Sequence, residues 1–404
     1  MLHCKSAMAG SMWGCFRDRG LVARSILIWM NSVERGCRIG RSRNLEMNTR
    51  IDASALSSLT AAILVSLTGS GLAKELKDTK TEGWPEQVKE VKYLASSDKT
   101  LQPMLLRAAN DKSKRPLLVG LHSWSGDYRQ AGGEVVYARW CIEKDWHFIH
   151  PNFRGPNWTA DACGSDKVVK DIVDAVSYMR KNHQVDTDRI YLIGVSGGGH
   201  ASLLMAGRAP DIWAGVSAWV PISDIQVWWK QKRTGSHSKY ADHIEKSVGG
   251  RPDEVESAMR ECVKRSPLTY LDKAVKVNLD INAGVTDGHA GGSVPFTHSL
   301  HAFNRVVPER DRIPRGFINA FYRRQALPVG SEKPERDPLY GKKSVLFRKV
   351  SKDTRVTIFE GKHEIIHHAG LNWLARQRRG KPAVWTVEIE YHLKTEESES
   401  ESGK

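Results

Sequence analysis

The sequence has few cysteines, and their spacing excludes one common class of metal site. Six cysteines occur among 404 residues and none belongs to a C-x-x-C pair, which excludes a zinc ribbon. Three of them lie in the first 46 residues. The other three leave two alternatives open, one disulfide beside a free thiol or three small buried hydrophobic residues: Cys141, Cys163 and Cys262.

The sequence also lacks a basic stripe of the kind that binds nucleic acid. Its formal net charge is +15, but residues 1–46 hold eight basic residues against three acidic ones and supply five of these charges. The remaining basic residues are scattered and are not interleaved with aromatic residues. We therefore expect no nucleic-acid partner.

Apolar runs of membrane-spanning length are missing except over residues 53–72. The basic residues 1–46 have little periodicity, so we expect an unstructured leader and place the true start at Met47. A charged start, an apolar run and small residues up to Ala73 predict a signal peptide over residues 47–73, with an uncleaved membrane anchor as the alternative. We expect export to the periplasm or the extracellular space, without stable membrane insertion if the signal is cleaved.

The remainder of the chain alternates between strand-like and helix-like segments. An opening hairpin is expected over residues 88–94 and 104–109, and short apolar runs predict buried strands near residues 115–122, 146–152, 189–195, 214–221, 276–285 and 355–360. Helical periodicity covers residues 166–182, 295–306 and 367–376. This alternation predicts an α/β fold with a mostly parallel central sheet flanked by helices, in one domain over residues 74–394.

Three further segments are expected to decorate this domain. We predict that residues 223–275 form a helical cap insertion and that residues 307–354 form an irregular surface insertion. Residues 382–393 are predicted to form an edge strand. Residues 395–404 read as a disordered acidic tail. Four tryptophans near the cap either stack on sugar rings or belong to the core: Trp213, Trp219, Trp228 and Trp229.

The segment at residues 189–204 carries the clearest chemical motif. A β-branched and aliphatic run ends in Gly194-Val195-Ser196-Gly197-Gly198 and a helix-forming run follows, which is the G-x-S-x-G pattern of a nucleophile elbow. The glycines allow the strand and the helix to pass closely, and the turn presents the serine at a helix N-terminus. Ser196 is the predicted nucleophile, and the Gly197 N–H is one predicted oxyanion donor.

A serine nucleophile needs a base and an acid that orients it, and later strands supply both. Asp287 follows the strand at residues 276–285, and His363 follows the strand at residues 355–360. Their order after Ser196 predicts a Ser-His-Asp triad. The loop after the strand at residues 115–122 provides the second oxyanion N–H, from either Trp124 or Ser123, while His122 is expected to be structural.

Residues 363–367 also form an H-E-x-x-H sequence, the motif of a zinc hydrolase. That motif works when one helix places His363 and His367 on the same face beside the Glu364 carboxylate. Here Gly361-Lys362 precedes the first histidine where a strand ends, and Trp373 occupies the position of a third ligand. We therefore expect no metal and no cofactor, and keep the zinc hydrolase as a lesser alternative.

Ser196, Asp287 and His363 resemble the triad of the α/β-hydrolase superfamily, and more closely that of the prolyl-oligopeptidase-type catalytic domain. Residues 151–155, 266–268, 284–295 and 359–364 are similar to that family's motifs around the elbow, the acid and the histidine. The resemblance implies an α/β-hydrolase fold over about residues 89–379. Its peptidases carry a propeller domain ahead of the hydrolase domain, and only a short segment precedes the fold here.

These observations predict an exported serine hydrolase that forms an acyl-enzyme on Ser196. Because we expect no propeller domain ahead of this fold, we expect an open active-site cleft and an ester substrate. The four tryptophans near the cap suggest a carbohydrate ester. The alternative is a serine peptidase of the prolyl-oligopeptidase type acting on short peptides. A non-catalytic binding protein on the same scaffold is a lesser alternative. The sequence assigns no substrate-binding residue and no oligomeric state.

Overall fold

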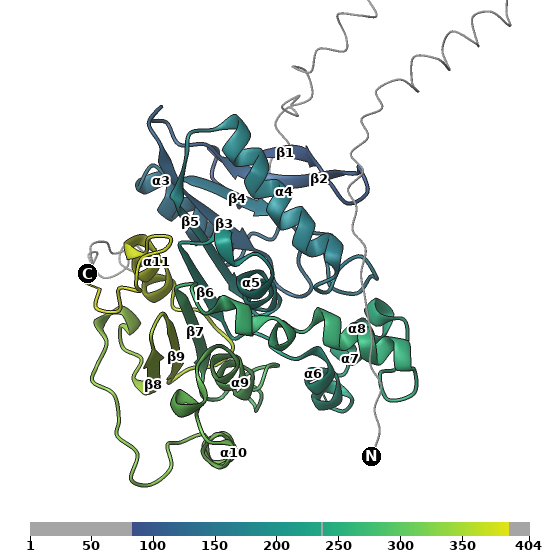
Figure 1. Cartoon of the computed structure of the whole chain (residues 1–404), viewed down its shortest axis with the longest axis vertical. Coiled ribbons are helices and arrows are strands. Elements are labelled where there is room, and N and C mark those ends of the chain that lie inside the picture. Colours follow the sequence, from purple (N-terminus) through teal and green to yellow (C-terminus); the bar gives the residue numbers. More distant parts are fainter. Residues whose placement is uncertain (1–82, 236, 388–404) are drawn as a thin grey trace, which may run out of the picture. The chain divides into compact units, whose positions relative to one another are not determined.

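The computed structural model describes residues 83–235 and 237–387, and the predicted leader, signal peptide and acidic tail lie outside these residues. Within them, no helix is both long enough and apolar enough to cross a bilayer. The elements form a single twisted sheet with helices against both faces and a group of helices beside one end (Figure 1).

The described residues contain a nine-stranded sheet in the order β1-β2-β4-β3-β5-β6-β7-β9-β8. Six consecutive strands of the sheet, β4-β3-β5-β6-β7-β9, run parallel to one another. At the two edges of the sheet, β1, β2 and β8 are antiparallel to their neighbours. The strands are β1 (Lys89–Leu94), β2 (Leu101–Arg107), β3 (Arg115–Leu121), β4 (His147–Pro151), β5 (Val185–Val195), β6 (Gly215–Trp219), β7 (Leu279–Gly284), β8 (Val345–Ser351) and β9 (Thr354–Phe359). The predicted mostly parallel α/β fold is confirmed.

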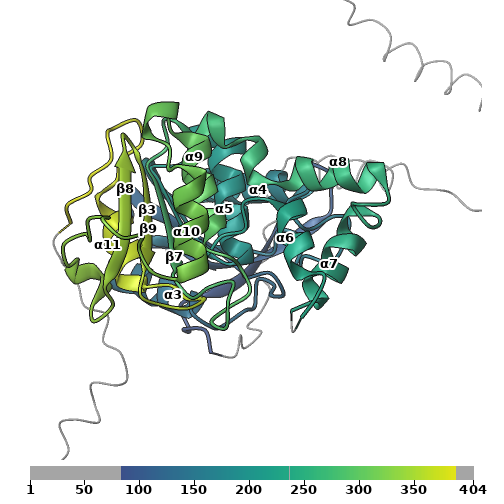
Figure 2. The same ribbon diagram turned by 90° about the horizontal axis from the view of Figure 1, so that it is seen from below.

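Both faces of the sheet are covered, because the parallel strands are apolar on both sides. One core contains residues of α4 (Asp166–Asn182), α5 (Gly197–Arg208), α9 (Thr297–Val306) and α10 (Arg315–Arg324). The opposite core contains residues of α3 (Glu134–Glu143) and α11 (His367–Arg376). Figure 2 shows the two groups of helices on opposite sides of the strands.

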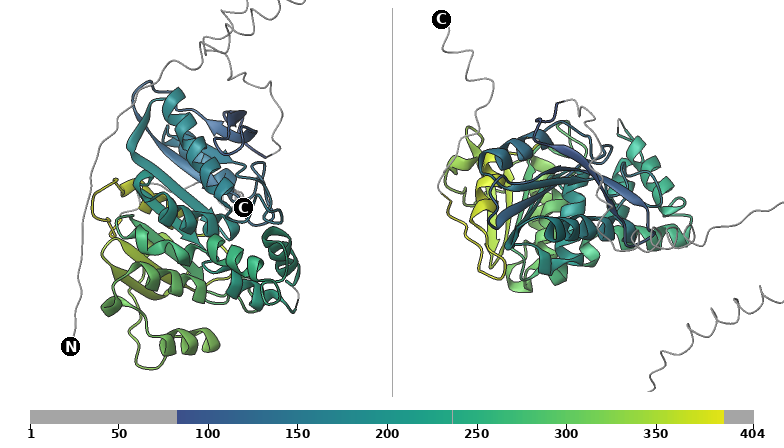
Figure 3. Two further views of the ribbon diagram at one scale, coloured as in Figure 1. Left: turned by 45° about the vertical axis from the view of Figure 1, so that its right-hand side comes forward. Right: turned by 90° about the horizontal axis from the view of Figure 1, so that it is seen from above.

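The predicted cap is helical. It comprises α6 (Ile225–Lys232), α7 (Lys239–Val248) and α8 (Glu256–Arg265), which share a small core with Trp124, Cys163 and Val294 of the neighbouring loops. The three helices stand together beside the sheet in both views of Figure 3. They follow β6, so the cap is inserted after the strand next to the elbow strand.

Two expectations about the later part of the chain are wrong. Residues 307–354 are not irregular, since they contain α10, whose Ile318 and Phe321 are buried, and the edge strand β8. Residues 382–387 form no strand, and residues 388–393 lie outside the described part of the chain. The Trp385 ring instead stacks on Trp373 of α11, with ring centroids 5.5 Å apart.

Candidate active site

Ser196 lies in the sharp turn between β5 and α5. Its backbone has φ 57° and ψ −114°, a conformation that non-glycine residues rarely adopt. A Cβ atom at Gly194 would lie 2.3 Å from the Gly198 carbonyl oxygen, so the strand and the helix can pass only because residue 194 is glycine. The strained turn holds the Ser196 side chain at the end of the sheet.

Asp287 and His363 follow the carboxyl ends of the paired strands β7 and β9, and they contact each other. The His363 Nδ1–H donates to Asp287 Oδ2 at 2.7 Å. The other oxygen, Oδ1, accepts the backbone N–H groups of Gly288 at 2.9 Å and Val294 at 3.0 Å. Asp287 is fully buried and His363 is partly exposed. This arrangement fixes the neutral tautomer of His363 with its lone pair on Nε2.

The glycine-rich loop after Asp287 is needed for this contact. A Cβ atom at Gly292 would lie 2.1 Å from Asp287 Oδ1 and 2.6 Å from His363 Cβ. The loop therefore passes directly against both side chains, and this explains its glycines.

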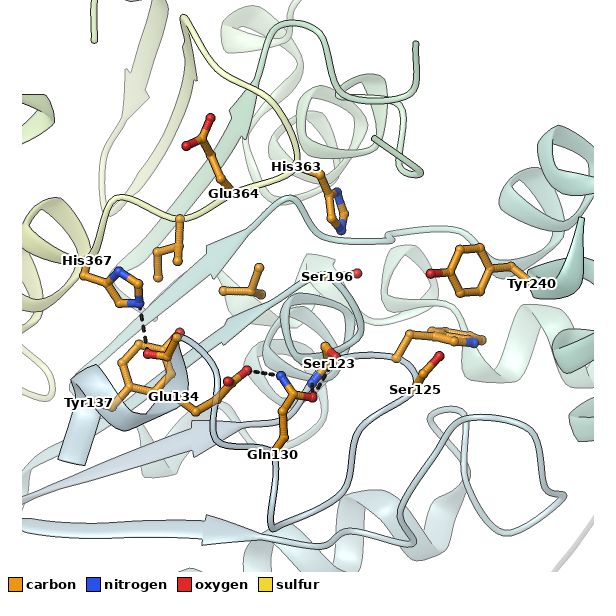
Figure 4. A pocket seen from close by; sticks show the side chains of 14 residues that line it. Ser123, Ser125, Gln130, Glu134, Tyr137, Ser196, Tyr240, His363, Glu364 and His367 are labelled. Carbon is orange, nitrogen blue, oxygen red and sulfur yellow. Dashed lines mark hydrogen bonds between the residues drawn. The ribbon is translucent and has the colours of Figure 1, made fainter. Parts of the chain in front are cut away.

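Ser196 and His363 line a common cavity of about 450 Å³. Figure 4 shows the His363 imidazole over the Ser196 hydroxyl, and the Tyr240 hydroxyl of the cap helix α7 directed toward the same point. Ser196 is 9% exposed, which leaves its hydroxyl accessible from the cavity. The structure thus brings together the three predicted triad residues.

The backbone of the loop after β3 packs against the start of α5, as an oxyanion hole requires. A Cβ atom at Gly197 would lie 2.3 Å from the Trp124 backbone nitrogen. The backbone N–H groups of Gly197 and Trp124 are therefore neighbours beside Ser196. Trp124 N–H has no acceptor among the described residues. Ser123 N–H donates to Gln130 Oε1 at 3.1 Å and is not free for an oxyanion. Of the two predicted donors, Trp124 is the one left available.

Gln130 and Glu134 support this loop, and the sequence analysis missed both. Gln130 Oε1 also accepts the Ser123 hydroxyl at 2.7 Å, and its Nε2–H donates to Glu134 Oε1. The Gln130 amide fills the turn, since a Cβ at Gly126 would lie 1.8 Å from its oxygen. The spacing of four residues between Gln130 and Glu134 is the one sequence signal, and it is too common to identify a site.

Glu134 is a buried carboxyl group at the wall of the cavity. Its side chain is 4% exposed, and no described residue's side chain pairs with Oε2. Burial raises the pKa of Glu134 to about 7, because the charged form loses its hydration, while hydrogen bonds from backbone N–H groups and Gln130 partly oppose the shift. Glu134 therefore titrates near neutral pH.

The H-E-x-x-H residues do not share a helix face. The helix α11 begins at His367, so His363 and Glu364 lie in the preceding loop. The His367 Nε2–H donates to the Gly133 carbonyl at 3.0 Å, and Glu364 accepts from Lys343 at 2.9 Å. Among the described residues, no group of three or more His, Cys, Asp or Glu is arranged to hold a metal ion. The arrangement that a zinc hydrolase needs is not formed.

Several predicted side chains are structural. The four tryptophans near the cap are each at most 2% exposed, and each donates its indole N–H to a protein acceptor: Trp213, Trp219, Trp228 and Trp229. The sugar-stacking hypothesis is therefore wrong for these residues.

His122 is buried between the Ser123 and Asn152 carbonyl oxygens, at 2.9 and 2.8 Å, and is structural, as expected. The three described cysteines are buried and free, which excludes the disulfide alternative.

Comparison with known proteins agrees with this geometry. A model of the prolyl oligopeptidase family matches residues 145–312, which include Ser196 and Asp287. Dipeptidyl aminopeptidase BIII of Pseudoxanthomonas mexicana is 25% identical over 255 residues, 54% of this chain and 35% of that protein. The chain thus spans about a third of the length of this relative.

Solved structures of peptidases are similar to parts of the chain. A putative dipeptidyl aminopeptidase IV from Bacteroides ovatus is 21% identical with a TM-score of 0.44, over 56% of this chain and 31% of that one. The acylaminoacyl peptidase of Pyrococcus horikoshii is 17% identical with a TM-score of 0.42, over 55% and 35%.

The mostly parallel sheet and the serine in the strained turn between β5 and α5 have the architecture of an α/β-hydrolase fold with a nucleophile elbow. Residues 145–312 are similar to the prolyl oligopeptidase family. The expected resemblance is confirmed.

Proposed function

We propose that this protein is a serine peptidase in which Ser196, His363 and Asp287 form the catalytic triad. The observation that carries the proposal is the 2.7 Å hydrogen bond between His363 and Asp287 at the cavity that contains Ser196. The family match and the aminopeptidase relative favour an amide substrate over an ester. The four tryptophans that had suggested a carbohydrate ester are buried and cannot stack on a sugar ring.

In the proposed reaction the Ser196 Oγ attacks the carbonyl carbon of the scissile bond. His363 Nε2 takes the hydroxyl proton as the new C–O bond forms, and Asp287 stabilises the imidazolium through Nδ1–H. The carbonyl oxygen becomes negative and accepts hydrogen bonds from Gly197 and Trp124 N–H. The tetrahedral intermediate then expels the amine, which takes the proton from His363 as the C–N bond breaks.

A water molecule releases the acyl group in the second half of the reaction. His363 takes a proton from the water while its oxygen bonds to the acyl carbon, and the proton returns to Ser196 Oγ as the ester bond breaks. The same steps hydrolyse an ester, so a carboxylic ester substrate is the second candidate. Export of the chain stays a prediction, because residues 1–82 lie outside the described part.

A fluorophosphonate probe tests the mechanism, because it phosphonylates only an activated serine. We expect the probe to label the purified protein, with or without a metal chelator, and peptide mapping to find the label on Ser196. Ser196→Ala abolishes labelling, and His363→Ala lowers its rate by roughly 10³-fold or more, since the base is lost. Absence of label on the folded protein would overturn the serine mechanism.

The same preparation separates the two substrate classes. A library of short peptides and a panel of simple carboxylic esters are incubated with the protein and with Ser196→Ala. Peptide cleavage that Ser196→Ala abolishes supports the peptidase. Ester cleavage without cleavage of any peptide would contradict it and favour the esterase.

A further inference from the structure

The peptide bond between Ser123 and Trp124 carries the available oxyanion donor, and its carbonyl end is anchored. The Ser123 carbonyl oxygen lies 2.9 Å from His122 Nδ1 and accepts the Gly126 N–H at 3.3 Å. In a trans peptide the N–H points away from the carbonyl oxygen. Anchoring this oxygen therefore sets the direction of the Trp124 N–H, whose nitrogen lies against Gly197 at the start of α5.

Gln130 holds the other side of Ser123. Its Oε1 accepts the Ser123 backbone N–H at 3.1 Å and the Ser123 hydroxyl at 2.7 Å. Its Nε2–H donates to Glu134 Oε1. Figure 4 shows these contacts as one chain of hydrogen bonds along the wall of the cavity that contains Ser196. The chain ends one residue before the residue whose N–H is the oxyanion donor.

The neighbours of the Gln130 amide permit a single orientation of it. The Ser123 N–H can only donate, and an ionised Glu134 can only accept. A rotated amide would direct its NH2 group at the Ser123 N–H and its oxygen at the carboxylate, so both hydrogen bonds would be lost. Glu134 therefore determines which end of the Gln130 amide faces Ser123.

Stability does not account for the position of Glu134. The residue is 4% exposed, and Gln130 is the one side chain in the described part of the chain that donates to its carboxyl group. Burying an ionised carboxylate with so few donors is unfavourable. The contact with Gln130 accounts for the buried carboxyl only if the oxyanion loop depends on it.

We propose that Glu134 and Gln130 are positioning residues of the oxyanion hole. The Glu134 carboxylate fixes the orientation of the Gln130 amide, and the amide holds Ser123 so that the Trp124 N–H stays directed at the oxyanion. The proposal rests on the proposed acyl transfer at Ser196 and requires neither side chain to touch the substrate. Breaking the chain of hydrogen bonds should slow the reaction and leave substrate binding unchanged.

Methionine substitutions test the order of the chain. Gln130→Met removes the acceptor of Ser123, and we expect the fluorophosphonate labelling rate and kcat to fall about 10²-fold, the effect of losing one oxyanion donor. Glu134→Met frees the Gln130 amide to rotate and lowers both by about tenfold. The double variant loses no more than Gln130→Met alone, because Glu134 acts only through Gln130.

The stability of Glu134→Met separates positioning from a structural role. Removing the buried charge raises the free energy of unfolding at mildly alkaline pH, as urea denaturation measures. The variant is then more stable and yet less active. A residue needed only for folding would change both quantities in the same direction.

Exchanging the two residues keeps the chain of hydrogen bonds. In Gln130→Glu/Glu134→Gln the new carboxylate accepts from Ser123 and the new amide donates to that carboxylate, so we expect a labelling rate close to that of the parent protein. Gln184→Met is the control for Gln130→Met, since it makes the same change at an exposed position and leaves labelling unchanged.

Binding measurements distinguish positioning from direct contact with the substrate. We expect Ser196→Ala and Ser196→Ala/Gln130→Met to bind the cleaved peptide or ester equally well in calorimetry. Phenylboronic acid, which forms a tetrahedral anionic adduct with an active-site serine, binds Gln130→Met at least about tenfold more weakly than the parent protein. A substrate affinity that falls as far as kcat/KM would overturn the proposal, because Gln130 would then bind substrate directly.

Labelling of the parent protein distinguishes a failure of this proposal from a failure of the serine mechanism. Normal labelling of the parent protein and of folded Gln130→Met would overturn the positioning role and leave the mechanism intact. Absence of labelling in the parent protein would overturn both. Circular dichroism verifies folding, and Gln130→Leu replaces the methionine variant if that one does not fold.

Discussion

Glu134 links the active-site loop to the pH dependence of stability. Its pKa is raised from 4.5 to about 7 in the folded protein, chiefly by burial, so the folded state binds a proton more tightly than the unfolded state between these values. This stabilisation is fully present below pH 4.5 and is lost as the pH rises through about 7. At about 1.4 kcal/mol per pKa unit the loss is about 3 kcal/mol.

Glu134→Gln removes the titration and keeps an acceptor for Gln130. Relative to the parent protein, we expect the variant to gain about 3 kcal/mol of unfolding free energy between acidic and mildly alkaline pH. Urea denaturation of both proteins at several pH values measures the difference. Glu86→Gln makes the same chemical change at an exposed position and gives no such gain. Parallel pH profiles for the parent and Glu134→Gln would show that the carboxyl is not the titrating group.

The grouping of the three residues of the proposed triad was predictable from the sequence because each residue follows a strand. Parallel strands end at one edge of the sheet, so order along the chain was enough to bring Ser196, Asp287 and His363 together. Glu134 was not predictable, because its burial depends on contacts between segments distant in sequence. The four tryptophans near the cap were mispredicted for the same reason. A tryptophan side chain occurs both in hydrophobic cores and in sugar-binding sites, and only the tertiary packing shows which of the two it belongs to.

The elbow is the element whose geometry depends most on single residues. A Cβ at Gly194 would approach the Gly198 carbonyl to 2.3 Å, and β5 is paired with a strand on each side while Gly198 lies in the helix α5. Because neither the strand nor the helix can move away, we expect Gly194→Ala to destabilise the protein by several kcal/mol or to displace Ser196 from the cavity.

Thermal unfolding and fluorophosphonate labelling measure these two outcomes for Gly194→Ala. Gly316→Ala is the control, since Gly316 lies in the helix α10 with open space around its Cα. There the substitution stabilises by about 0.5–1 kcal/mol and leaves labelling unchanged. Normal stability together with normal labelling in Gly194→Ala would contradict the close approach of β5 and α5.

Elements with a strong local pattern were the ones that the sequence predicted well. The helix α4 spans Asp166–Asn182 as expected, because its apolar residues recur every three to four positions and the Ser165 hydroxyl accepts the Val168 N–H at its start. In residues 307–354, α10 also has apolar residues at helical spacing, Phe317, Ile318 and Phe321, but its ten residues stand among proline- and arginine-rich sequence that obscured this pattern. Their structure depends on packing against α9 and β9.

At the scale of the molecule, the cap has a core separate from the two cores that flank the sheet. Cys262 of α8 lies in the cap core, and Cys141 of α3 lies in the core between the sheet and α11. Both are free and buried, and burial raises the pKa of each thiol, that of Cys262 to about 12. Neither thiol reacts in the closed state, because the thiolate is the nucleophile.

Alkylation of these two cysteines therefore reports how their surroundings open. The cap core is the smaller of the two and buries fewer apolar side chains, so local opening of the cap should cost less than opening of the sheet. We expect iodoacetamide in mild denaturant to modify Cys262 before Cys141, as peptide mass spectrometry resolves, and both at similar rates in strong denaturant. Equal rates under mild conditions would mean that the cap and the sheet open as one unit. A cap that opens first would widen the cavity between Tyr240 of α7 and Ser196 without unfolding of the sheet that positions Ser196, Asp287 and His363.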